Sequence, residues 1–243
     1  MKNPEAKTPK QIAAKQRAFM RRIFGDNYAD KTSADFIDQA WRDTTRRVPL
    51  YAKSEPEGSP GRIALQQFAK NKIAQIGAKM TGGGGVFALK GRAANAQLTN
   101  TLAKRRVNTA HIGHLIKLQE AITRKHGKTL ASGGMKFGHV QKLLNKYLKY
   151  MWCAGKMPRP PACPFDGRIL KWHLPRRKNA FWQELHPGGN RHLAKQPKHK
   201  NIRLWSQSDS IEDYLVWLAA GDEMRKRLNY NSLAEWELFI FEA

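Results

Sequence analysis

The sequence has few acidic residues, few cysteines and no long apolar run. Of its 243 residues, 19 are Asp or Glu and two are Cys. Two cysteines cannot form the disulfide framework of a small secreted domain, and scarce carboxylates disfavour a two-metal nuclease site, which needs several Asp or Glu ligands. No stretch approaches the roughly 18 apolar residues of a membrane-spanning helix, and the N-terminal residues lack the apolar core of a secretory signal. We therefore expect a cytoplasmic protein without a membrane partner.

Positive charge is what the sequence has in excess. The 44 Lys and Arg residues give a formal net charge of +25. Residues 208–243 hold eight acids and three bases, a balance of −5, which leaves +30 on the first 207 residues. A charge of this size repels itself in a free folded monomer, so we expect an anionic partner to neutralise it. Nucleic acid is the first candidate, DNA before RNA; a subunit of a larger nucleoprotein complex is the structural alternative.

Helix signals dominate the chain, and the alternation typical of strands is nearly absent. Capping residues and apolar residues at helical spacing predict helices over 9–24, from a Ser33 cap onward, and over 60–79, 92–106, 109–126 and 138–153. Ser210 with Asp213, and Ser232 with Glu235, predict two further helix starts at the acidic C-terminal end. We therefore expect a mainly α protein: a basic multi-helix bundle with a loop-rich basic segment over 175–203 and acidic C-terminal helices.

Three regions follow from composition. Residues 1–53 are an N-terminal basic helical region, and the loop over 54–61 ends it. Residues 59–207 form the expected basic helical body that binds nucleic acid. Residues 208–243 form acidic helices that we expect to pack on the body or on a partner protein.

The helix predicted over 138–153 combines a core stripe with a row of lysines. Seven apolar residues recur at helical spacing along it, while Lys142, Lys146 and Lys149 lie on the other side. We expect these lysines to form an exposed cationic ridge that contacts phosphates. Trp172, among the bases that follow, adds a residue on which a nucleic-acid base can stack. The candidate nucleic-acid contacts are Lys142, Lys146, Lys149, Arg168, Arg176, Arg177, Lys178, Arg191, His192, Lys195, Lys198 and Lys200.

Cysteine and histidine give only a weak metal signal. Cys153, Cys163, His173 and His186 fall in one part of the chain, but their spacing matches no known zinc finger and includes no Cys-x-x-Cys pair. We therefore expect no metal and no cofactor.

One local pattern points to catalysis. A Gly-containing turn over 130–134 is followed by the lysine helix, a Pro-rich loop and then Pro164-Phe165-Asp166 at an expected helix start. Over 130–168 this order resembles the helix-hairpin-helix DNA glycosylases, although the hairpin lacks their Leu-Pro-Gly-x-Gly. The resemblance implies Asp166 as the catalytic carboxylate and Lys142 or Lys146 near the Schiff-base lysine, acting on a base taken out of the stack. The alternative is that Asp166 is only a helix N-cap and the lysines bind phosphate.

Overall fold

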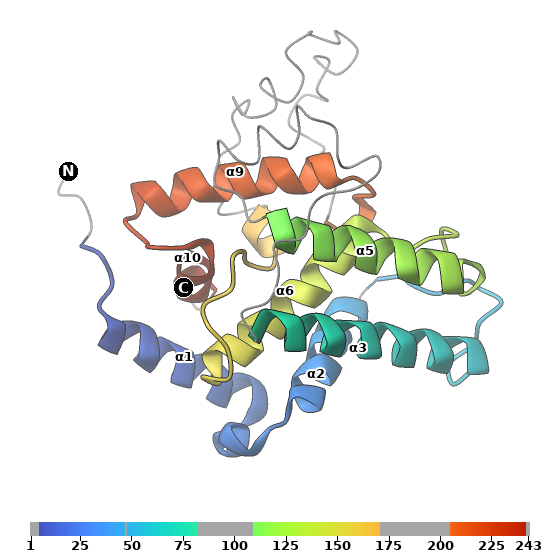
Figure 1. Ribbon diagram of the computed structural model, residues 1–243, viewed down its shortest axis with the longest axis horizontal. Helices are drawn as coiled ribbons and strands as arrows, with labels where there is room; N and C mark the ends of the chain where they lie inside the picture. Colours follow the sequence, from blue (N-terminus) through green and yellow to red (C-terminus); the bar gives the residue numbers. More distant parts are fainter. Residues whose placement is uncertain (1–4, 47, 82–108, 171–204, 242–243) are drawn as a thin grey trace, which may run out of the picture.

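The chain folds into helices packed around one central helix, α6 (Figure 1). The computed structural model describes residues 5–46, 48–81, 109–170 and 205–241. In these residues there is no β-strand, only a bridge that pairs Tyr51 with Leu130, so the mainly α prediction is confirmed. The elements are α1 (Pro9–Phe24), η1 (Asp26–Asp30), α2 (Ser33–Thr45), α3 (Pro60–Thr81), α5 (Thr109–His126), η3 (Gly127–Thr129), α6 (Phe137–Cys153), η5 (Trp205–Gln207), α9 (Ile211–Arg227) and α10 (Leu233–Ile240).

Local capping sets the helix boundaries close to where the sequence places them. Thr8 caps α1 through a capping box, and Gly25 ends the helix with a φ of 78°, a value that favours glycine. Ser210 and Ser232 cap α9 and α10, as predicted. The predicted cap of α2 is off by one residue, because Thr32 rather than Ser33 has the extended backbone and accepts the capping hydrogen bond.

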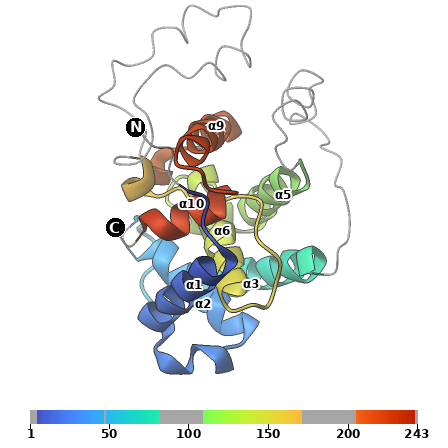
Figure 2. The ribbon, with the colours of Figure 1, turned by 90° about the vertical axis from the view of Figure 1, so that its left-hand side faces the viewer.

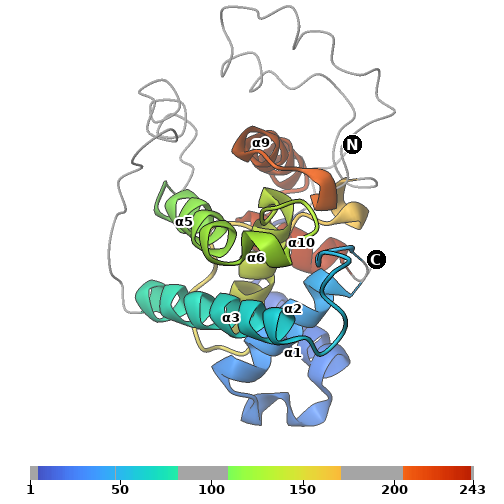
Figure 3. The same ribbon diagram turned by 90° about the vertical axis from the view of Figure 1, so that its right-hand side faces the viewer.

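Helix α6 lies in the middle of the bundle, where α1, α2, α5, α9 and η5 all pack against it. Figure 2 shows α10 between α1 and α9 on one side, and Figure 3 shows α3 and α5 side by side on another. Every residue of α6 is buried, including its three lysines. The predicted exposed ridge of Lys142, Lys146 and Lys149 is therefore wrong, because neighbouring elements cover the polar side of this helix as well as the apolar one.

The buried apolar side chains form one cluster that runs through most of the described helices. Phe36 from α2, Ile73 from α3, Tyr147 from α6 and Trp236 from α10 all belong to it and are almost fully buried. The acidic C-terminal helices thus share this core with the basic body. The helix predicted over 92–106 and the basic segment over 175–203 lie outside the described residues. Among the helices that the structure describes, none combines the length and the apolar character needed to cross a membrane.

Candidate functional site

Lys146 is held inside the bundle by an acid from another helix. Its Nζ lies 3.3 Å from Oδ2 of Asp43 on α2, and the Tyr150 hydroxyl donates a hydrogen bond to the same carboxylate oxygen. Burial alone would raise the pKa of Asp43, but the ammonium of Lys146 and the hydrogen bond from Tyr150 outweigh it and lower the pKa. Asp43 is therefore charged at neutral pH, and Lys146 balances that charge.

Lys149 makes a second ion pair, with the acidic C-terminal helix. Its Nζ lies 2.5 Å from Oε2 of Glu237 on α10, and the two side chains are only 3% and 2% exposed. Burial raises the pKa of Glu237, while Lys149 and Lys146 act in the opposite direction. This pair joins the acidic end of the chain to the basic body. Glu235 makes a similar contact with Arg159 of the Pro-rich loop.

Lys142 packs against an aromatic ring. Its Nζ lies 4.0 Å from the ring centroid of Trp205, a cation–π distance, and His139 meets the same ring edge-on at 5.5 Å between centroids. The three lysines predicted to contact phosphate, Lys142, Lys146 and Lys149, thus contact other parts of the protein instead. They join α6 to α2, α10 and η5.

Asp166 caps the turn of helix that follows the Pro-rich loop. Its Oδ1 accepts hydrogen bonds from the backbone N–H groups of Arg168 and Ile169, at 3.0 and 3.2 Å. This geometry is that of an N-cap. The loop itself is held by Gln141, whose side-chain amide donates to the carbonyl of Phe165 at 2.6 Å and accepts from its N–H at 3.1 Å. Nothing in the sequence pattern predicts this role of Gln141.

The residues that the glycosylase resemblance names as catalytic make contacts that stabilise the fold. α5, the turn after it, α6, the loop and Asp166 follow one another as expected. A Schiff-base lysine must attack with a free lone pair. Here the Nζ of Lys146 lies 3.3 Å from the Asp43 carboxylate, and the Nζ of Lys142 lies 4.0 Å from the centroid of the Trp205 ring. The enzyme interpretation stays a prediction, and the contacts of Asp166 and of the two lysines are accounted for without it.

A different surface, which sequence reasoning did not single out, carries exposed positive charge. Helix α3 contains no acidic residue and α5 contains only Glu120, and the two helices pack side by side (Figure 3). We call their outward side, with the turn after α5, the α3–α5 surface. Its exposed or half-exposed cations are Lys72, Lys79, Lys117, Arg124, Lys125 and Lys128. The signal was available in the sequence as two helices that are rich in bases and nearly free of acids.

The cations gather at both ends of the seam between α3 and α5. At one end, the ring of Phe68 lies 4.5 Å from Lys125 Nζ and 5.5 Å from Lys72 Nζ, measured to the ring centroid. At the other end, burial lowers the pKa of His114, and the nearby charges of Lys79 and Lys117 lower it further. His114 is therefore neutral at pH 7, and the positive charge there comes from the two lysines.

Most of the other predicted site residues lie outside the described residues. Of the predicted nucleic-acid contacts among them, Arg168 is described: it is exposed, and its Nη1 donates a hydrogen bond to the carbonyl of Phe241 at 2.9 Å. Cys153 and Cys163 are buried and form no disulfide, and the described ranges contain no group of His, Cys, Asp and Glu arranged to hold a metal. The candidate contacts outside these ranges are Arg176, Arg177, Lys178, Arg191, His192, Lys195, Lys198 and Lys200, and the metal candidates there are His173 and His186.

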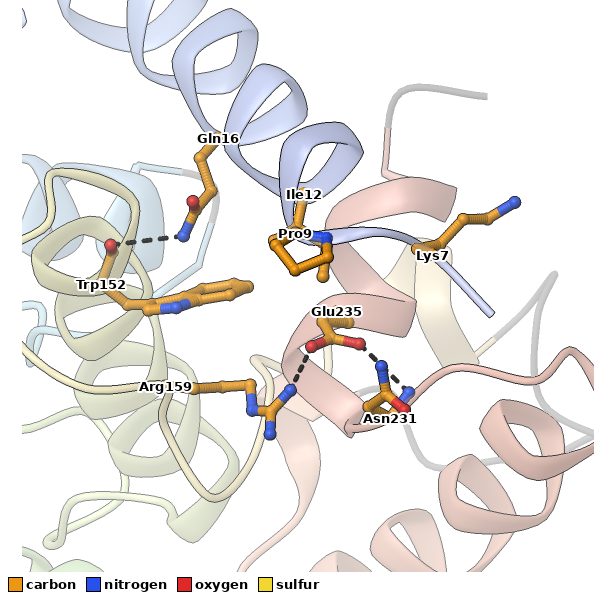
Figure 4. Close-up of a pocket in the computed structure, with 8 residues that line it drawn as sticks. All are labelled: Lys7, Pro9, Ile12, Gln16, Trp152, Arg159, Asn231 and Glu235. Carbon is orange, nitrogen blue, oxygen red and sulfur yellow. Dashed lines mark hydrogen bonds and ion pairs between the residues drawn. The ribbon is translucent and has the colours of Figure 1, made fainter. Parts of the chain in front are cut away.

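A pocket of about 380 Å³ opens between the starts of α1 and α10 (Figure 4). Its polar groups largely contact one another. Glu235 pairs with Arg159 and accepts the N–H of Asn231 at 3.1 Å, while Gln16 donates to the carbonyl of Trp152 at 3.4 Å. We therefore assign no ligand to this pocket.

Two features of the structure bear on function: the internal ion pairs along α6 and the cationic surface on α3 and α5. Comparisons of the chain with family models, with characterised proteins and with solved structures find no match.

Proposed function

We propose that this chain binds nucleic acid, DNA in preference to RNA, through the α3–α5 surface. The observation that carries the proposal is the run of exposed cations along two adjacent helices whose only acid is Glu120. Phosphate contacts by Lys and Arg supply most of the sequence-independent affinity of nucleic-acid-binding proteins. The net charge of +25 supports the same partner.

The spacing of these cations suits a phosphate backbone. Residues seven apart on a helix are about 10 Å apart along its axis, which is the separation of Lys72 from Lys79 and of Lys117 from Arg124. One strand of duplex DNA carries a phosphate about every 3.4 Å along the axis. A strand that lies along the seam therefore has phosphates near the cations at both ends.

A charge-matched pair of variants tests the proposal. One variant, K117Q/R124Q/K128Q, removes three exposed cations from the α3–α5 surface, and the other, K156Q/K226Q/R227Q, removes three exposed cations from other elements. Binding is measured by fluorescence anisotropy with labelled single-stranded and duplex DNA and RNA. Because each lost phosphate contact lowers affinity, we expect the first variant to bind at least about tenfold more weakly at about 50 mM salt. The second is expected to stay within about threefold of the wild type, because only long-range attraction changes.

Two results would contradict the proposal. Equal losses in the two variants would show that affinity depends on net charge and not on this surface. A wild-type protein that binds none of the four nucleic acids would remove the function itself. A preference for RNA over DNA in the same panel would correct the partner but keep the surface.

A further inference from the structure

Four cations surround the ring of Phe241, the residue that follows α10. They come from α1, from α6 and from the turn of helix after the Pro-rich loop. The ring also meets Phe19 of α1 edge-on, at 5.8 Å between centroids. Measured to the ring centroid, the distances are 4.7 Å for Lys149 Nζ, 5.0 Å for Arg22 Cζ, 5.3 Å for Arg168 Cζ and 5.7 Å for Lys146 Nζ. We call this group the Phe241 cluster.

The charges in the Phe241 cluster are not balanced. Lys146 and Lys149 are buried and pair with Asp43 and Glu237. Arg22 and Arg168 are exposed, and among the described residues no carboxylate pairs with either. Two guanidinium groups therefore stand beside an aromatic ring at the surface with their charge available to an anion. Guanidinium groups bind phosphate through paired hydrogen bonds and also stack on aromatic rings.

Phe241 lies at the C-terminal end of α10, and helix ends open more easily than helix interiors. Its N–H donates to the carbonyl of Glu237 at the end of α10, and its carbonyl accepts from Arg168. The ends of helices open locally at a small fraction of the free energy of global unfolding. The ring can therefore leave its place without disrupting the core around α6.

We propose that Phe241 covers a nucleotide-binding site. A nucleobase has the flat π face that the ring now presents to the cations, and its phosphate would lie between Arg22 and Arg168. A free mononucleotide and the terminal nucleotide of a strand share this chemistry. The site contains no residue of the α3–α5 surface, so this proposal can be tested independently of the function proposed above.

The test compares a variant that lacks the Phe241 ring with one that keeps an aromatic ring at this position. Phe241→Ala removes the ring, whereas Phe241→Trp keeps an aromatic side chain in place. Binding of adenosine monophosphate is measured by titration calorimetry, with inorganic phosphate and adenosine as probes of the two halves and a 5′-phosphorylated oligonucleotide as the strand end. Thermal unfolding of each variant checks that it is folded.

We expect F241A to bind adenosine monophosphate at least tenfold more tightly than the wild type and F241W to show no gain. The gain should disappear in F241A/R22Q and F241A/R168Q. It should persist in F241A/R21Q, because Arg21 is exposed on the same helix but pairs with Asp26 at 3.3 Å. A folded F241A without a gain, a gain that survives loss of either Arg22 or Arg168, or an equal gain for phosphate alone would overturn the proposal. The oligonucleotide then decides which source of the nucleotide the site prefers.

Discussion

Removing the carboxylate of Glu237 is expected to destabilise the fold strongly. In the variant Glu237→Gln, the ammonium of Lys149 stays buried, 3% exposed, with the rings of Phe19 and Phe241 at 4.0 and 4.7 Å from its Nζ and no carboxylate beside it. Breaking one side of a buried ion pair costs about 3–5 kcal/mol. For a protein of this length, each kcal/mol lowers the melting temperature by about 2–4 °C.

The matched control removes both charges. Lys149→Met combined with Glu237→Leu replaces the pair with apolar side chains, a change that is often neutral or even stabilising for buried pairs. Unfolding free energies from urea titrations at pH 7 measure both variants. We expect the single variant to be at least about 2 kcal/mol less stable than the double variant. Equal stability of the single and the double variant, or a loss of stability below about 1 kcal/mol in Glu237→Gln, would refute the claim that Lys149 and Glu237 form a buried pair in which each charge needs the other.

Three further predictions concern α6, the loop and pH. Leu144→Ala should lower the free energy of unfolding by about 2–5 kcal/mol, because it leaves a cavity in the core. Lys146→Ala should also destabilise the fold, because it leaves Asp43 without its cation. Urea titration measures both variants, and an unchanged stability of Lys146→Ala would contradict the burial of this ion pair. Asp166→Asn should leave stability and nucleic-acid affinity nearly unchanged, since Asn caps as well as Asp; abolition of a base-excision activity by this change, with binding intact, would instead support catalysis. Burial lowers the pKa of His111 to about 3, and burial together with the charges of Lys136 and Lys142 lowers the pKa of His139 to about 4. Both lie below the unfolded value of about 6.5, so the unfolded state binds more protons and stability falls as pH drops from about 6.5 towards 4; equal unfolding free energies at pH 7 and pH 5 would contradict this.

The helices could be predicted from the sequence because their ends depend on local chemistry. Thr8 with Pro9, Ser210 and Ser232 mark helix starts through hydrogen bonds within a few residues, and the structure places the helices there. The buried stripe of α6 follows in the same way from its apolar spacing.

The lysines of α6 could not be placed from the sequence. Their spacing shows that they share one side of the helix, but not what covers that side. The partner of Lys146 is Asp43, 103 positions earlier, and the partner of Lys149 is Glu237 on the last described helix. Long-range ion pairs leave no periodic signal, so a buried polar side and an exposed one look alike in sequence. The charge of the α3–α5 surface, by contrast, could have been found from composition, because the helices predicted over 60–79 and 109–126 contain a single acid. Their packing side by side could not.

The salt dependence of DNA binding tests the central claim most directly. The logarithm of the binding constant falls linearly with the logarithm of salt concentration, with a slope of about −0.9 per neutralised phosphate for duplex DNA. If Lys117, Arg124 and Lys128 contact phosphates, the slope of K117Q/R124Q/K128Q should be shallower than that of the wild type by about 2 to 3, while K156Q/K226Q/R227Q keeps the wild-type slope. Identical slopes for wild type and K117Q/R124Q/K128Q would contradict binding through the α3–α5 surface.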